Sequence, residues 1–196
     1  HRPVAFMDFL NWTGEDVWFA HSVYVNQEEI NLYAVTGCGV AHCPTSNMRL
    51  ASGIAPVLEM LRAGVKVGLG VDGSASNDTQ DCLENTKMAI CLARAVNQDA
   101  ANVTNEQALH MALSDRTIAV GSDADLIIVN LNTLRSAPVH DLTSALTLCA
   151  HSEDVDTVMV AGEILMQNGK LTRVDEEWLI KECNSALKIL KKRAGI

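Results

Sequence analysis

The chain has 196 residues, of which 48% are hydrophobic, and a formal net charge of −9. This length and hydrophobic content are enough for a globular protein of one or two domains. The acidic balance argues against a nucleic-acid partner, which would require a basic surface, and no apolar run approaches the roughly 20 residues that cross a bilayer. We therefore expect a cytoplasmic protein that binds neither nucleic acid nor a membrane.

The chain opens on His1-Arg2-Pro3 rather than on methionine, and a stretch with helical spacing follows directly, from Val4 to Leu10. We expect this sequence to begin inside a larger protein. Up to about residue 100, short apolar runs then alternate with amphipathic helical stretches, which is the pattern of β/α units. The predicted strands cover 16–20, 39–41 and 66–71.

The helices between these strands carry their own start and stop signals. The first should begin at Asn26, with Glu29 as its capping-box partner, and should end at Gly37. A second helix carries the apolar residues of 54–61, and a longer one runs from about 83 to 96. Three such units are too few to close a barrel of eight strands, so an isolated piece would leave a sheet edge open.

The pattern changes after about residue 114. The run 125–129 is typical of a strand, and 155–165 alternates and turns at Gly162 like a hairpin. A helical stripe follows from 175 to 193. These patterns divide the chain into a partial barrel domain at 1–117, a small β domain at 118–174 and a C-terminal helix at 175–196.

Polar residues follow the predicted strands: His21 the first, His42 the second and Asp72 the third. Because active sites in parallel α/β proteins lie at the carboxyl ends of strands, we expect these three side chains to meet at one rim. The loop after Asp72, which includes Ser74, leaves room for a ligand, and the segment 42–50, which includes Asn47, can line a polar substrate. The structural alternatives are helix caps and rigid polar turns. We expect the remaining histidines of the later chain to be structural or exposed; they are His110, His140 and His151.

Four segments carry a specific combination of motifs: Phe19–His21, Ala41–Asn47, Gly53–Pro56 and Gly68–Asn77. Together they resemble the deaminases and chlorohydrolases of the amidohydrolase superfamily, a group that includes 8-oxoguanine deaminase, the triazine hydrolases and the S-adenosylhomocysteine/methylthioadenosine deaminases. The pattern of 124–129 and 158–162 extends the resemblance over nearly the whole chain.

The resemblance implies a (β/α)8 TIM barrel beside a small β-sandwich, with our three strands as barrel strands six to eight and the chain as the C-terminal portion of such a protein. Asp72 then matches the aspartate that binds the metal and moves a proton from the attacking water to the leaving group. His21 matches the histidine of strand six that faces the substrate, with Asn47 and Ser74 as further substrate contacts. The implied cofactor is one divalent metal ion, zinc or alternatively iron.

Two metal-ligand motifs of the family, His-x-His and His-x-x-Glu, do not occur in this sequence. Because a protein metal site needs three or four ligands, we expect this chain alone neither to hold a catalytic metal nor to turn over substrate. The segment from Leu113 to Asp123 is also shorter than the family pattern, so we expect part of the parent protein to be missing there.

The resemblance implies a hydrolytic deaminase of an amino-substituted nitrogen heterocycle. The segment 41–78 favours an 8-oxoguanine-like, guanine-like or triazine-like substrate, whereas the part from Ser136 onward favours S-adenosylhomocysteine or methylthioadenosine. The alternatives from other classes are a truncated, non-catalytic homologue that acts as a structural module, and an unrelated α/β binding protein. Family members are commonly oligomeric, and the helix at 175–193 can contribute to a contact between copies.

Overall fold

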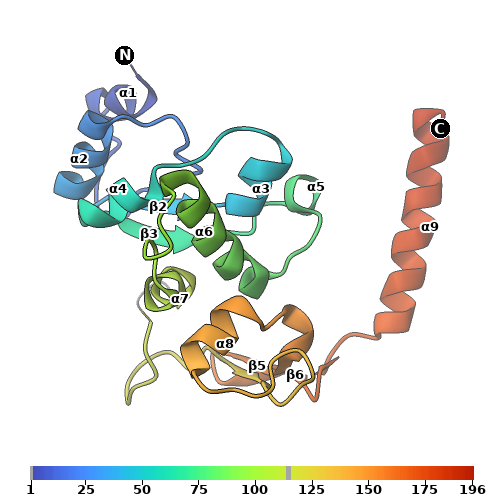
Figure 1. Cartoon of the computed structure of the whole chain (residues 1–196). Helices are drawn as coiled ribbons and strands as arrows, with labels where there is room; N and C mark the ends of the chain where they lie inside the picture. The colour runs from blue at the N-terminus through green and yellow to red at the C-terminus, as the bar shows by residue number, and fades with distance from the viewer. Residues whose placement is uncertain (1, 114–115) are drawn as a thin grey trace. The chain divides into compact units, whose positions relative to one another are not determined.

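The computed structural model describes residues 2–113 and 116–196, and the chain forms two units (Figure 1). The first unit extends to Thr117 and also includes Leu131–Ser152, and the second comprises Ile118–Asn130 and Glu153–Ile196. The segment Leu131–Ser152, which we had expected within the small β domain, therefore packs with the first unit. The predicted deletion between Leu113 and Asp123 falls partly on residues 114–115, and the predicted internal start falls on residue 1; these lie outside the described residues.

The sheet of the first unit has three parallel strands in the order β1-β2-β3. They are β1 (Trp18–Ala20), β2 (Gly39–His42) and β3 (Lys66–Leu69). All three lie within or close to the predicted runs, but β1 begins two residues later than predicted and β3 ends two residues earlier. Asp72 therefore lies three residues beyond the end of its strand rather than at the end itself.

Eight helices belong to the described part of this unit, and their bounds are α1 Pro3–Phe9, α2 Gln27–Thr36, α3 Pro44–Arg49, α4 Val57–Arg62, α5 Ser74–Asn77, α6 Cys82–Asn97, α7 Asn105–Leu113 and α8 Leu142–Leu148. Helix α2 starts and stops as its sequence predicts. The Asn26 side chain accepts from the backbone N–H of Glu29, and the Glu29 carboxylate accepts from the N–H of Asn26. Gly37 ends the helix with φ of 75°, a left-handed conformation that glycine adopts without strain.

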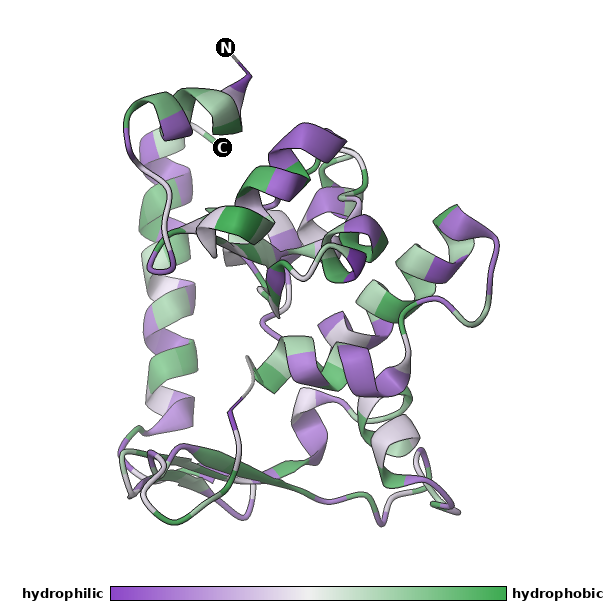
Figure 2. Ribbon diagram, turned by 90° about the vertical axis from the view of Figure 1, so that its left-hand side faces the viewer, coloured by the Kyte–Doolittle hydropathy of each residue, from purple (hydrophilic) through white to green (hydrophobic). Residues whose placement is uncertain are grey.

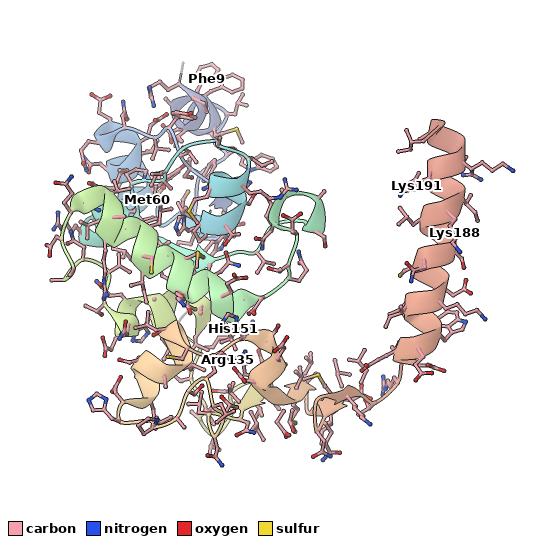
Figure 3. The ribbon with its side chains drawn as sticks, turned by 45° about the vertical axis from the view of Figure 1, so that its right-hand side comes forward. Phe9, Met60, Arg135, His151, Lys188 and Lys191 are labelled. Carbon is pink, nitrogen blue, oxygen red and sulfur yellow. The ribbon has the colours of Figure 1, made fainter. Side chains whose placement is uncertain are left out.

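The two faces of the sheet differ in what covers them. Phe19, Val40 and Val67 are aligned in register and pack with Ile30 and Tyr33 of α2 in one hydrophobic core. Met60 of α4 is fully buried in the same core (Figure 3). Because side chains alternate along a strand, the other face carries the remaining positions. These are Trp18, Ala20, Gly39, Ala41, Lys66 and Gly68.

That second face is partly exposed to solvent. The Trp18 ring lies so close to Gly39 that a Cβ added to this glycine would sit 2.4 Å from it. Trp18 itself is 48% exposed, and Ala20 and Lys66 are exposed as well. The first unit thus has one face of its sheet covered by helices and one face lined by small residues and open to solvent.

Hydrogen bonds connect the segment Leu131–Ser152 to helices α6 and α7 of the first unit. Thr86 of α6 donates to the backbone oxygen of Thr147 at 3.0 Å, and Asn105 of α7 donates to the Ser144 hydroxyl at 2.7 Å. The Ser152 N–H donates to Asp81, the N-cap of α6, at 3.0 Å. These bonds connect residues far apart in the sequence, and hydrophobic periodicity does not reveal them.

The second unit is a four-stranded antiparallel sheet followed by a helix. The elements are β4 Leu126–Val129, β5 Val155–Val160, β6 Glu163–Gln167, β7 Lys170–Leu171 and α9 Glu176–Ala194. The predicted hairpin turns at Ala161 and Gly162, whose φ values of 50° and 80° suit a tight two-residue turn. A second tight turn at Asn168-Gly169 joins β6 to β7.

Helix α9 is amphipathic and exposed along its length. Hydrophilic and hydrophobic residues alternate along it in Figure 2, and Lys188 and Lys191 lie near its C-terminal end (Figure 3). Across the described residues, no helix combines the length and apolar character needed to span a membrane.

Candidate functional site

His21 and Asp72 meet at the carboxyl end of the three-stranded sheet. His21 directly follows β1, and its backbone N–H donates to the Ala41 oxygen and so continues the β1–β2 ladder. Its Nε2 lies 3.8 Å from Oδ2 of Asp72, and the two side chains are 40% and 30% exposed. An imidazole and a carboxylate are therefore brought together, partly open to solvent, at the rim where parallel α/β proteins place their sites.

The Asp72 carboxylate is held by a donor on each oxygen. The Ser46 hydroxyl donates to Oδ2 at 2.6 Å, and the Gly73 N–H donates to Oδ1 at 2.7 Å. The Ser46 hydrogen bond, followed by that of Gly73, lowers the pKa of Asp72 to about 2. Asp72 is thus an anion across the physiological pH range, with a fixed orientation.

Both rim residues have unusual backbone conformations. The φ values are 65° for His21 and 63° for Asp72, in the left-handed region that residues with a Cβ seldom adopt. Such strain persists only where the surrounding contacts impose it, and it is concentrated at functional sites. The strained backbone therefore occurs at both residues whose side chains meet at the rim, His21 and Asp72.

Asn47 supports His21 from below the surface. Its Oδ1 lies 2.8 Å from His21 Nδ1, and because an amide oxygen can only accept, this nitrogen carries the proton. Asn47 is only 2% exposed. This burial leaves little surface for a substrate, so its contact with His21 replaces the direct substrate contact that we expected.

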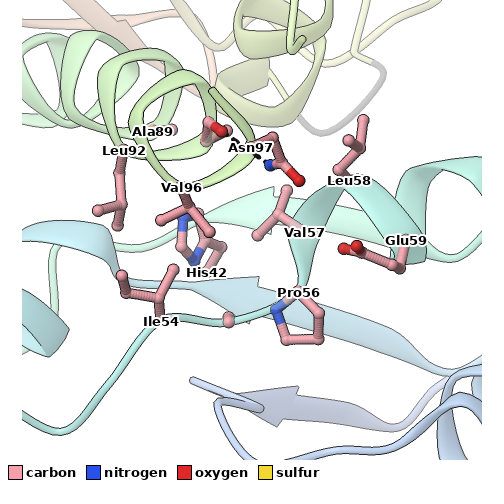
Figure 4. Close-up of a pocket in the computed structure, with 12 residues that line it drawn as sticks. His42, Ile54, Pro56, Val57, Leu58, Glu59, Ala89, Leu92, Val96 and Asn97 are labelled. Carbon is pink, nitrogen blue, oxygen red and sulfur yellow. Dashed lines mark hydrogen bonds between the residues drawn. The ribbon is translucent and has the colours of Figure 1, made fainter. Parts of the chain in front are cut away.

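His42 does not join the rim, contrary to our expectation. It has the parity of Val40, on the sheet face that the helices cover, and it is 2% exposed. The side chain lines a pocket of about 140 Å³ together with Ile54, Val57 and Val96 (Figure 4). Among residues 2–113 and 116–196 its Nδ1 finds no hydrogen-bond partner, and burial, followed by the charge of His21, lowers the pKa of His42 to about 4.

Ser74 begins the short helix α5 and has an exposed side chain, two residues beyond Asp72. Its role as a substrate contact stays a prediction. Ser46 was not among the predicted site residues. The available signal was its position beside Asn47, in the segment that follows β2.

As a metal site, this rim is incomplete within the described chain. In residues 2–113 and 116–196, no three His, Cys, Asp or Glu side chains gather closely enough to hold a metal ion. The Asp72 carboxylate suits one ligand position, since it is ionised, partly open and fixed by donors on both oxygens. The residues present therefore fit part of a metal site and would need further ligands from outside this chain.

The sequence profile of the amidohydrolase family matches residues 4–165. The 5-methylthioadenosine/S-adenosylhomocysteine deaminase of Dictyoglomus thermophilum is 41% identical over 201 residues, which cover 97% of this chain and 47% of that protein. The 8-oxoguanine deaminase of Pseudomonas aeruginosa is 40% identical over 199 residues, covering 96% of this chain and 44% of that protein.

Among solved structures, an adenosine deaminase from Xanthomonas campestris with bound zinc superposes with a TM-score of 0.93 at 32% identity. The match covers 98% of this chain and 46% of that one. The chain thus spans about half the length of the relatives it matches.

Proposed function

The chain belongs to the amidohydrolase family, and from this premise we propose that it forms part of a metal-dependent hydrolase that removes an amino group from a nitrogen heterocycle. The observation that carries the proposal is the pairing of Asp72 with His21, 3.8 Å apart at the carboxyl rim of parallel strands. A fixed carboxylate beside an imidazole is the arrangement that proton transfer in hydrolysis requires.

In this proposal, Asp72 is both a metal ligand and the group that moves a proton. Asp72, together with ligands from outside this chain, would hold a divalent metal that supplies activation of a water molecule, and the zinc of the Xanthomonas structure favours zinc over iron. Asp72 accepts the proton of the attacking water and later delivers it to the departing amine. His21 faces the substrate and orients it, and Ser74 contributes a hydroxyl at the same rim.

We further propose that β1, β2 and β3 are the last three strands of a (β/α)8 barrel, strands six to eight. Two observations support three consecutive strands of a barrel: the strands are parallel and in sequence order, and the sheet face with most of the small residues is partly open. Their number within the barrel, six to eight, comes from the family resemblance alone. The antiparallel sheet β4–β7 would then be part of a small β-sandwich. The domain boundary stays near residue 118, with Leu131–Ser152 assigned to the barrel unit.

The intact mass of the natural protein, measured together with its metal content, tests this assignment. We expect a mass well above 21.2 kDa and about one zinc or iron per chain. A mass of 21.2 kDa without metal would favour the alternative of a truncated, non-catalytic module.

The substrate class that we propose is an amino-substituted heterocycle of the purine or triazine type. The 8-oxoguanine deaminase relative supports an oxopurine, and the 5-methylthioadenosine/S-adenosylhomocysteine deaminase relative, at similar identity, supports an adenosine derivative. Within this chain, the segment 41–78 favours the first class and the part from Ser136 onward favours the second, so both classes belong in the assay. A cytoplasmic location and an oligomer formed through α9 stay predictions.

Ammonia release by the full-length gene product tests the activity. The panel should contain 8-oxoguanine, guanine, methylthioadenosine, S-adenosylhomocysteine and an aminotriazine. The Asp72→Asn variant should lose about 100-fold or more in kcat, the contribution expected of a general acid–base group. Asp99→Asn changes a carboxylate that only accepts from the Ala101 N–H after α6, so it should retain activity. Equal activity of the two variants would sink the proposal.

A further inference from the structure

Two adjacent residues of α3 each hold one of the two rim groups. The Ser46 hydroxyl bonds Oδ2 of Asp72 at 2.6 Å, and the Asn47 amide oxygen bonds Nδ1 of His21 at 2.8 Å. Ser46 is 1% exposed and Asn47 is 2% exposed, whereas the side chains that they bond are partly open. The buried pair therefore lies behind the rim and does not form part of its open surface.

Helix α3 is itself anchored on both sides of this pair. Thr45 donates to Oδ1 of Asn85 in α6 at 3.0 Å, and Arg49 forms an ion pair with Asp78 at the end of α5. The Ser52 N–H closes the following turn by donating to the Asn47 backbone oxygen at 2.9 Å. Because its neighbours fix the backbone of α3, the two buried side chains have little freedom to follow a movement of the rim.

We propose that Ser46 and Asn47 are positioning residues that hold Asp72 and His21 in register with each other. The proposal deepens the hydrolase function proposed above and rests on it for its kinetic part. Ser46 fixes which way the carboxylate faces. Asn47 fixes the ring orientation of His21 by accepting from the Nδ1–H, which places Nε2 on the side of Asp72 and the ligand space.

The physical reason for such a pair lies in the strained backbone of the groups it holds. His21 and Asp72 both have left-handed φ values, so neither conformation is the local preference of its own segment. A single short helix that bonds both side chains sets their separation more accurately than two independent loops. Removing one such supporting bond typically costs 10- to 100-fold in metal affinity or activity, by general experience with groups that orient metal ligands.

Ser46→Ala and its control Thr36→Val, both made in the full-length gene product, test the bond between Ser46 and Asp72. Both variants remove a hydroxyl, but that of Thr36 bonds the Leu32 oxygen within α2, away from the rim. We expect Ser46→Ala to lower kcat about tenfold or more with KM little changed, and to lose zinc at lower chelator concentration. Ser46→Thr, which retains a hydroxyl, should restore both. Zinc loss and kcat in Ser46→Ala equal to those of Thr36→Val would overturn the positioning role of Ser46.

The tautomer of His21 tests the other half without any activity measurement. In protein with ¹⁵N-labelled histidine, the unaltered chain should show the proton of His21 on Nδ1, and Asn47→Leu should shift the population toward Nε2–H. An Nδ1 without a proton in the unaltered protein would overturn the proposal, even if Asn47→Leu failed to fold. The two proposals can fail separately. If the full-length protein deaminates no compound of the panel, the proposed function fails. The positioning role still stands if His21 carries a proton on Nδ1 and Ser46→Ala loses zinc at a lower chelator concentration than the unaltered protein.

Discussion

The buried imidazole of His42 makes stability depend on pH. Unfolded histidine takes up a proton below its ordinary pKa of 6.5, whereas burial lowers the pKa of His42 to about 4 in the folded chain. The unfolded state therefore binds more protons between these values, and the folded state loses stability as pH falls from 6.5 to 4. The full difference amounts to about 3 kcal/mol.

Urea denaturation in steps from pH 7 to pH 4 measures this dependence. His42→Leu removes the titrating group and the unpartnered Nδ1, so we expect the slope over this range to flatten while stability near pH 7 changes little. Identical slopes in parent and variant would contradict the assignment of the effect to His42.

At the scale of single residues, the prediction that His42 lies at the rim was wrong. Its position at the end of a strand predicts a rim residue, but it shares the parity of the buried Val40 and lies on the helix-covered face. His21 and Asp72 reach the rim because their left-handed backbones turn the chain after β1 and beyond β3. The sequence predicted which residue types matter there, but not this turn.

Among the elements, α6 depends on the N-cap residue Asp81. Its carboxylate accepts from the N–H of Glu84 at 3.0 Å and from the N–H of Ser152 at 3.0 Å, and it lies 3.4 Å from His151. Burial acts to raise the pKa of Asp81, but these backbone donors and the His151 charge outweigh it and leave the pKa below its usual value. One carboxylate therefore caps a helix and fastens the returning segment.

We expect Asp81→Ala to lower the free energy of unfolding by about 1–3 kcal/mol, because it removes a cap and takes the acceptor from two partly buried N–H groups. Since the folded pKa is depressed, this stabilisation is present above the ordinary pKa of 3.8 and disappears as pH falls below it. Chemical denaturation at pH 7 and at pH 3 measures the difference. Asp141→Ala, at the exposed N-cap of α8, is the matched control and should cost less; an equal cost would contradict the role of burial.

Elements whose start, end and periodicity are encoded in neighbouring residues were predicted well. Helix α2 has its capping box and its terminal glycine in the sequence, and the β5–β6 hairpin has its alternation and its Gly162. Helix α3 was expected to be a loop, because Pro44 and the short polar residues after it favour turns as strongly as a six-residue helix. Its fold is decided by bonds to Asn85 and Asp72, which are distant in the sequence.

At the scale of the whole molecule, the solvent accessibility of Trp18 tests whether further strands cover the exposed face of the sheet. Trp18 is 48% exposed on the face lined by small residues, and its ring packs on Gly39. If β1–β3 are part of a closed barrel, this face becomes the barrel interior, which side chains fill. The indole should then be shielded from solvent in the full-length protein.

Iodide quenching of the full-length gene product, compared with its Trp18→Phe variant, isolates the emission of this residue. We expect that emission to be blue-shifted and resistant to quenching, with free N-acetyltryptophanamide as the reference for an accessible indole. A Trp18 signal quenched as readily as an exposed indole would mean that no strands cover this face. The barrel assignment would then fail, although the hydrogen bonds from Ser46 and Asn47 would still connect α3 to Asp72 and His21 within the first unit.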